Sequence, residues 1–187
     1  MEIYLVRHTT PSVDLALCYG QTDLDLADSF ESEAAAIKEK LPLVFDAVYS
    51  SPLQRCAKLA GFLTQGPVHY DARIMEISFG EWELKPWDDI GKDEIEHWAE
   101  NLEHRAPPGG ESLSDLFLRV NEFIDEITKM KYDRVLIVTH GGVLRSVLAR
   151  VLEMPVRNIF RFKLSFGDAF LFKHSPDSQR LSIRQIK

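Results

Sequence analysis

The chain has 187 residues, a hydrophobic share of 45% and a net charge of -7, from 22 Lys and Arg against 29 Asp and Glu. This length fits one domain with an ample core, so folding requires neither a disulfide framework nor a structural metal. The acidic balance argues against broad binding to nucleic acids or membrane surfaces. An anion can still bind, provided that positive charge is concentrated in one pocket.

The two cysteines, Cys18 and Cys56, give neither a disulfide framework nor zinc spacing, and we expect both to be free, buried thiols. The first seven residues lack the basic start and long apolar run of a signal peptide. No segment approaches transmembrane length. The sequence therefore predicts a soluble, cytoplasmic protein.

Short apolar runs alternate with helical patterns along the chain. The runs predict strands buried on both faces, at residues 3–6, 47–49, 135–138 and 170–172. Helical patterns cover residues 30–40, 53–63, 113–130 and 143–152, and a serine followed by Pro52 is expected to cap the second of these helices. This alternation predicts an α/β fold, a three-layer sandwich with a mostly parallel central sheet flanked by helices.

The least regular part of the chain runs from about residue 76 to 111. It holds all three tryptophans and a Pro-Pro-Gly-Gly break at residues 107–110. We interpret it as a cap that covers one end of the sheet within a single domain of residues 1–187. The tryptophans are expected to pack in the core or cap, with the alternative that Trp82 or Trp87 contacts an aromatic part of a substrate.

Side chains that could bind or react with a ligand follow three of the predicted strands. The first strand leads into Arg7 and His8, the second towards Arg55, and the third into His140 and two glycines that open a helix. Ligands of parallel sheets bind beyond the carboxyl ends of the strands, so we expect these four side chains to meet there. The glycines permit close backbone approach, and a helix N-terminus favours an anion. The pattern predicts a pocket for a phosphoryl group.

Each residue type suits a step of phosphoryl transfer. A histidine nucleophile needs one unprotonated ring nitrogen and a hydrogen bond that orients the other. Arginine presents a permanently charged fork that matches phosphate oxygens, and a second histidine adds a donor. The departing alkoxide needs an acid, for which Glu76 and Glu81 are the candidates, because a carboxyl group near a bound dianion retains its proton more readily.

The Arg7-His8 pair resembles the Arg-His-Gly motif of the histidine phosphatase superfamily, in its phosphoglycerate-mutase-like branch, with Thr9 in place of the glycine. The acid-phosphatase branch carries His-Asp at the later motif, where this chain has His140-Gly141. The resemblance spans nearly the whole chain, since four motifs occur in the family's order.

This resemblance implies a phosphomonoesterase that works through a phosphohistidine, with no metal and no organic cofactor. It implies His8 as the nucleophile and Glu76 as the proton donor. The full set of expected site residues comprises the catalytic His8, Glu76 and His140 and the phosphate-binding Arg7, Arg55, His140 and Gln21. The expected partner is a small-molecule phosphate monoester, with no nucleic acid and no membrane, and the chain is expected to be a monomer or homodimer.

Residues 18–23, 79–83 and 109–112 resemble more narrowly the α-ribazole phosphatases, which implies α-ribazole 5'-phosphate as the substrate. One alternative is a phosphoglycerate mutase or a broad-specificity phosphatase, although mutases of the family are generally longer. Another is a protein-phosphohistidine phosphatase or a non-catalytic binding module. The predicted cap argues against a protein substrate, and the complete set of pocket residues argues against a silent module.

Taken singly, each motif has an ordinary structural explanation. Arg119 and Arg145 are predicted as exposed helix residues, and Glu111 and Ser112 as the capped start of the next helix, or else as a border of the pocket. The four remaining histidines are predicted to lie on the surface. The conjunction of motifs at three strand ends is what favours catalysis.

Overall fold

The computed structural model describes residues 1–174 and 181–186. The predicted domain of residues 1–187 also includes 175–180 and 187, which lie outside the described residues. The described strands form one sheet in the order β3-β2-β4-β1-β5-β6. Their bounds are β1 Glu2–Arg7, β2 Ala47–Ser50, β3 His69–Tyr70, β4 Arg134–Thr139, β5 Ala169–His174 and β6 Leu181–Ile186.

The sheet is parallel on one side and antiparallel on the other. β1 pairs in parallel with β4, β4 with β2, and β2 with β3. β5 runs antiparallel to β1, and β6 antiparallel to β5. The predicted α/β fold with a mostly parallel sheet is confirmed. The sequence pattern missed β3, which has only two residues, and the edge strand β6.

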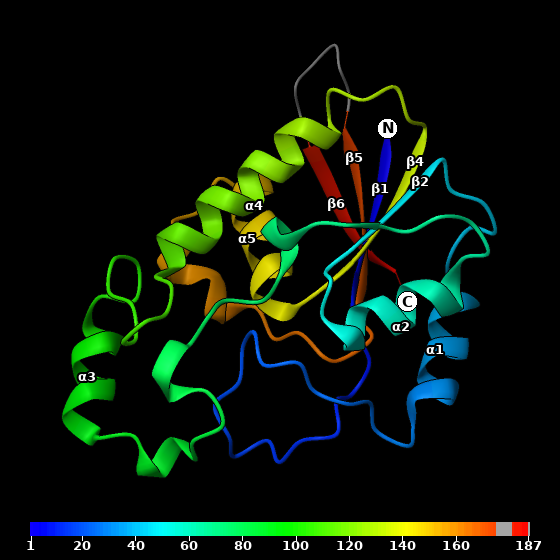
Figure 1. Ribbon diagram of the computed structural model, residues 1–187. Coiled ribbons are helices and arrows are strands. Elements are labelled where there is room, and N and C mark those ends of the chain that lie inside the picture. Colours follow the sequence, from blue (N-terminus) through cyan, green and yellow to red (C-terminus); the bar gives the residue numbers. More distant parts are fainter. Residues whose placement is uncertain (175–180, 187) are drawn as a thin grey trace.

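Helices cover both faces of the sheet (Figure 1), with α1 and α2 on one face and α4 and α5 on the other. Their bounds are α1 Phe30–Lys38, α2 Gln54–Leu63, α3 Lys92–Glu100, α4 Leu113–Ile127 and α5 Gly141–Val151. The predicted serine cap of α2 is wrong. Leu53 is the N-cap residue and no side chain caps the helix; the Ser51 hydroxyl lies two residues earlier, where it bonds to His140 and accepts from the Leu53 N–H.

β1 shows how the core fixes the strand ends. Ile3 and Leu5 pack with α4 and α5, whereas Tyr4 and Val6 pack with α1 and α2. Successive side chains of a strand point to opposite faces, so this short run is buried on both faces of the sheet. Burial of such side chains contributes about 1.5–3 kcal/mol each. The carboxyl end of β1 is therefore a rigid base for the residues that follow it.

Residues 76–111, predicted as a cap, pack against the loop of residues 12–28, and we refer to the two segments together as the cap. Residues 76–111 contain the 3₁₀ helices Gly80–Trp82 and Trp87–Asp89 and then α3. The loop of residues 12–28 pairs with them, since the Cys18 N–H donates to the Lys85 carbonyl at 2.9 Å and the Leu84 N–H to the Cys18 carbonyl at 2.7 Å. In Figure 1 both parts lie at the end of the sheet where β1 finishes.

Trp82 belongs to the interior of this cap. Its side chain is 3% exposed, packs with Cys18 and Ile90, and donates from Nε1 to a Glu94 carboxylate oxygen at 3.2 Å. Trp87 packs against the same cluster and is partly buried. The prediction that the tryptophans serve as packing residues is confirmed for these two.

Candidate active site

His8 follows β1 directly and is almost fully buried, with 2% of its surface exposed. Its backbone N–H donates to the Thr139 carbonyl at the end of β4, at 2.9 Å. Its ring Nδ1 lies 2.7 Å from the Thr9 carbonyl oxygen. A carbonyl only accepts, so Nδ1 carries the proton and Nε2 keeps its lone pair. Burial, and next the charge of Arg55, lower the pKa of His8 to about 3, so the ring is neutral at pH 7.

Thr9 occupies the position where the family motif has glycine. Its backbone is not among the positive-φ residues, so nothing in the local conformation requires glycine there. The Thr9 side chain is fully buried. The Thr9 group that bonds to His8 is its backbone carbonyl, which a glycine would also supply.

Arg55 and His140 form a buried pair beside His8. Arg55, on α2, is fully buried, and its Nη1 and Nη2 donate to the carbonyls of Thr22 at 2.8 Å and Gly20 at 2.6 Å. Its Nε–H donates to Nδ1 of His140 at 3.3 Å, which leaves the His140 proton on Nε2, 2.7 Å from the Ser51 hydroxyl. Burial, with the nearby charge of Arg55, holds the pKa of His140 well below its usual range. The ring centroids of His8 and His140 are 5.1 Å apart.

Arg7 is held from the other side, by the loop before β5. Its Nη1 donates to the Leu164 carbonyl at 2.7 Å, and its guanidinium lies 4.1 Å from the ring centroid of Phe166. Phe166 also contacts His8, with 5.5 Å between ring centroids. Among the described residues, the buried Nε–H of Arg7 has no acceptor. Phe166 belongs to no sequence motif and was therefore not predicted as a site residue.

Glu76 reaches the N-terminus of α5, which His140 caps. The Gly142 N–H donates to both carboxylate oxygens of Glu76, at 3.0 and 3.1 Å. A Cβ atom at Gly142 would lie 2.2 Å from Oε1 of Glu76, so this approach requires glycine. Glu81, the other candidate acid, is exposed on the 3₁₀ helix Gly80–Trp82.

Gln21 lies beside Glu76, but its amide N–H groups point to protein acceptors. Its Nε2 donates to the Glu76 carbonyl at 3.0 Å and to Glu111 at 3.4 Å. Its backbone N–H, like that of Phe79, donates to Glu83, at 2.9 and 3.1 Å. Glu83, which the sequence analysis did not single out, therefore ties the two parts of the cap together. The role of Gln21 as a phosphate ligand stays a prediction.

The prediction that Arg119 and Arg145 are exposed is wrong. The Arg119 side chain is 16% exposed and pairs with Glu111. Arg145 is half-buried, and burial lowers its pKa. A Cβ atom at Gly141 would lie 3.0 Å from Nη1 of Arg145 and 3.4 Å from Cζ of Arg7, so both guanidinium groups flank the start of α5. Positive charge thus gathers here despite the acidic composition.

The two cysteines lie in the interior of the protein. Cys18 and Cys56 are free and buried, as predicted. The Cys56 sulfur lies 3.4 Å from Nε2 of His140, and burial raises the pKa of this thiol. Within residues 1–174 and 181–186, no three or more His, Cys, Asp or Glu side chains are grouped so as to hold a metal ion. No helix in the same part of the chain is long and apolar enough to cross a membrane.

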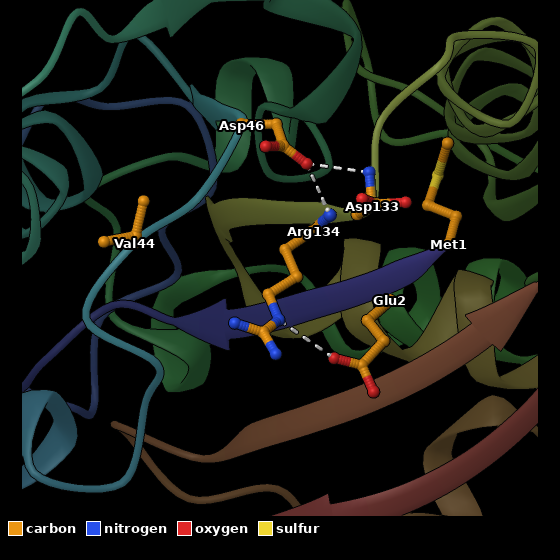
Figure 2. A pocket seen from close by; sticks show the side chains of 6 residues that line it. All are labelled: Met1, Glu2, Val44, Asp46, Asp133 and Arg134. Atoms are coloured by element: carbon orange, nitrogen blue, oxygen red, sulfur yellow. Dashed lines mark hydrogen bonds and ion pairs between the residues drawn. The ribbon is translucent and has the colours of Figure 1, made fainter.

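A hollow of about 590 Å³ lies at the opposite end of the sheet, where β1 and β4 begin (Figure 2). Three of its charged side chains, those of Glu2, Asp46 and Arg134, already have partners. Arg134 pairs with Glu2 at 3.3 Å, and Asp46 accepts from the backbone N–H groups of Asp133 at 2.7 Å and Arg134 at 2.9 Å. None of the predicted site residues lines it.

Known proteins resemble the chain along almost its whole length. An adenosylcobalamin/alpha-ribazole phosphatase from Salmonella typhimurium is 28% identical over 176 residues, which cover 89% of this chain and 87% of that protein. A 2,3-bisphosphoglycerate-dependent phosphoglycerate mutase from Xanthobacter autotrophicus is 28% identical over 193 residues, 94% of this chain and 93% of the relative. Length therefore does not separate this chain from that mutase, contrary to expectation.

Among solved structures, the alpha-ribazole phosphatase from Shigella flexneri superimposes with a TM-score of 0.90 at 26% identity, covering 100% of this chain and 96% of that one. Residues 3–186 match the model of the histidine phosphatase superfamily (branch 1). The chain belongs to this superfamily and is a phosphatase.

Proposed function

We propose that the chain hydrolyses phosphate monoesters in two steps through a phosphohistidine on His8. First, Nε2 of His8 attacks phosphorus in line, a P–N bond forms, and the bond from phosphorus to the leaving oxygen breaks. Water then attacks phosphorus, the P–N bond breaks, and inorganic phosphate leaves. The observation that carries this proposal is the neutral, oriented ring of His8, whose bond to Thr9 and pKa near 3 leave Nε2 free to attack.

The arginines and His140 stabilise the phosphoryl group as it transfers. The unpaired Nε–H of Arg7 is a buried donor that a phosphoryl oxygen would satisfy. Arg55 uses three of its five N–H groups on protein acceptors, so two remain for oxygens of the substrate. His140 orients Arg55 in this structure. A direct bond from His140 to the phosphoryl group requires its Nε2–H to leave Ser51.

Glu76 acts as the acid and then as the base. It gives its proton to the leaving oxygen in the first step and takes a proton from the attacking water in the second. Its contact with Gly142 supports this assignment, because it places the carboxylate at the helix N-terminus that also carries His140. Glu81 is exposed and makes no contact with this group among the hydrogen bonds of the described residues.

We further propose α-ribazole 5'-phosphate, in the biosynthesis of adenosylcobalamin, as the substrate. The names of the Salmonella and Shigella relatives support this choice, as does the resemblance in residues 18–23, 79–83 and 109–112. These segments touch one another in the cap, where Gln21 donates from its backbone N–H to Glu83 at 2.9 Å and from Nε2 to Glu111 at 3.4 Å. The main rival is a mutase or a phosphatase of broad specificity on the same scaffold.

A substrate panel separates these possibilities. We expect kcat/KM for α-ribazole 5'-phosphate to exceed that for phosphoserine and p-nitrophenyl phosphate by at least about tenfold, with or without a chelator. Equal values would indicate a broad-specificity phosphatase. Conversion of 3-phosphoglycerate to its 2-isomer would overturn the hydrolase assignment, and failure to label His8 with phosphate from any substrate would overturn the mechanism.

A further inference from the structure

The main chain around Glu76 has no regular secondary structure to hold it. The 3₁₀ helix Ala72–Ile74 ends just before it, and residues 75–79 belong to no helix or strand. A proton donor must nevertheless be placed closely, since a displacement of about 1 Å can reduce a rate by about 100-fold. Something other than a helix or strand must fix this segment.

Arg119, on α4, binds this segment with its whole guanidinium group. Nη1 donates to the carbonyls of Arg73 and Met75, both at 2.8 Å, and Nη2 donates to the Glu76 carbonyl at 2.9 Å. Nε and Nη2 also donate to the two carboxylate oxygens of Glu111, each at 2.8 Å. All five N–H groups of the guanidinium are therefore used.

Glu111 extends this contact to the other side of Glu76. Its Oε2 accepts from the backbone N–H of Ser78 at 2.9 Å and from Gln21 at 3.4 Å. Gln21 in turn donates to the Glu76 carbonyl. The backbone on both sides of Glu76 is thus bound by one ion pair, while the Glu76 carboxylate itself is bound at Gly142.

The pair is only slightly exposed, 16% at Arg119 and 23% at Glu111. Apolar residues of similar size often stabilise a fold as well as a buried ion pair does. They cannot bind three carbonyls and an N–H group. Within the described residues, the hydrogen bonds of the pair reach the backbone around Glu76 and the Gln21 side chain, and none reaches His8, Arg7 or Arg55.

We propose that Arg119 and Glu111 are positioning residues that hold Glu76 in place for proton transfer. This inference rests on the proposed function, in which Glu76 protonates the leaving oxygen. In this role the ion pair affects proton transfer alone. Removal of the pair should therefore slow most the hydrolysis of esters whose leaving group needs a proton.

The test compares two ester types in the full-length enzyme. p-Nitrophenyl phosphate has a good leaving group that departs without a proton, whereas an alkyl phosphate such as phosphoserine needs one. Since kcat/KM covers the reaction up to release of the alcohol, it reports the phosphorylation of His8. We expect Arg119→Met to lower kcat/KM for the alkyl ester about 100-fold and for p-nitrophenyl phosphate less than about threefold.

Three further variants keep the inference falsifiable if Arg119→Met folds poorly. Arg119→Lys retains the charge but not the fork, and Glu111→Gln retains the shape but loses an acceptor, so both should show the same selective loss at about 10-fold. Arg150→Met is the matched control, because Arg150 joins α5 to Asp125 and Asn121 of α4, and its hydrogen bonds and ion pair among the described residues do not involve residues 73–78. It should affect both esters equally.

A double variant separates positioning from general structural support. In a Glu76→Gln background, Arg119→Met should reduce kcat/KM for the alkyl ester less than about threefold further, because the acid is already absent. Equal loss for both esters in Arg119→Met, or additive loss in the double variant, would overturn the inference. If Glu76→Gln itself showed no preference for the good leaving group, the acid assignment under the proposed function would fail instead.

Discussion

Charged side chains have different kinds of partner at the two ends of the sheet. Where β1 and β4 begin, Glu2 bonds to Arg134 and Asp46 accepts two backbone N–H groups (Figure 2). Glu2 also pairs with Lys173. Where the same strands end, the guanidinium groups of Arg7 and Arg55 have no carboxylate partner among the described residues and donate instead to backbone carbonyls and a histidine.

This difference shows why a hollow alone does not locate a catalytic site. A carbonyl orients a guanidinium group without cancelling its charge, so the positive potential remains for an anion. At the other end Arg134 pairs with Glu2, and Asp46 and Asp133 also line the hollow of about 590 Å³, so its three carboxylates outnumber its one arginine and disfavour a phosphate. Substitutions at the end where the arginine charges have no carboxylate partner should therefore change the enzyme's activity.

The largest expected effect comes from His8→Ala. This variant removes the nucleophile while leaving Arg7, Arg55 and Glu76 in place, and kcat should fall by at least about 10⁴-fold. The measurement is phosphate release from p-nitrophenyl phosphate, with a circular dichroism melt to show that the variant is folded. Turnover at a rate near that of the wild type in a folded variant would exclude His8 as the nucleophile.

Much of this end could be predicted from the sequence, because it depends on local pattern. Apolar runs predict strands, and the residues directly after parallel strands meet at one edge of the sheet, which brought His8, Arg55 and His140 together. The helix start at the two glycines after His140 followed from the same reasoning.

The supporting residues could not be predicted in this way. Phe166 contacts Arg7 and His8 from a loop near the other end of the chain, and Arg119 binds carbonyls more than 40 residues away in sequence. The helix period shows only that Arg119 lies off the apolar stripe of α4, which is also where an exposed arginine would lie. Such contacts depend on how loops pack against the sheet. They join residues that are far apart in the sequence, so no local sequence pattern predicts them.

The second prediction concerns stability in acid. The pKa of His8 is about 3 in the folded protein and about 6.5 in the unfolded chain, so below pH 6.5 the unfolded chain binds a proton that the folded protein does not. The free energy of unfolding therefore falls as pH decreases from about 6.5 towards 3. Between pH 7 and pH 5 this residue should account for a loss of about 2 kcal/mol.

Urea denaturation at pH 7 and pH 5 measures this effect. His8→Asn lacks the buried imidazole and should not show this loss. Its free energy of unfolding relative to that of the wild type should therefore be about 2 kcal/mol higher at pH 5 than at pH 7. His97→Asn, which removes an exposed imidazole from α3, is the matched variant. The same change in His97→Asn would show that burial of His8 is not the cause.

The smallest effect is expected at the opposite end of the sheet, from Glu2→Gln. This substitution removes the ion pairs with Arg134 and Lys173, and since the three side chains are 28–57% exposed, the loss should not exceed about 1 kcal/mol. It should shrink further in 0.5 M salt, which screens exposed charges. kcat/KM should remain within about twofold of the wild-type value, because no substrate charge is balanced at this end. A loss of activity comparable to that of His8→Ala, with stability retained, would mean that the paired end of the sheet also takes part in catalysis, and the distinction between the two ends would not hold.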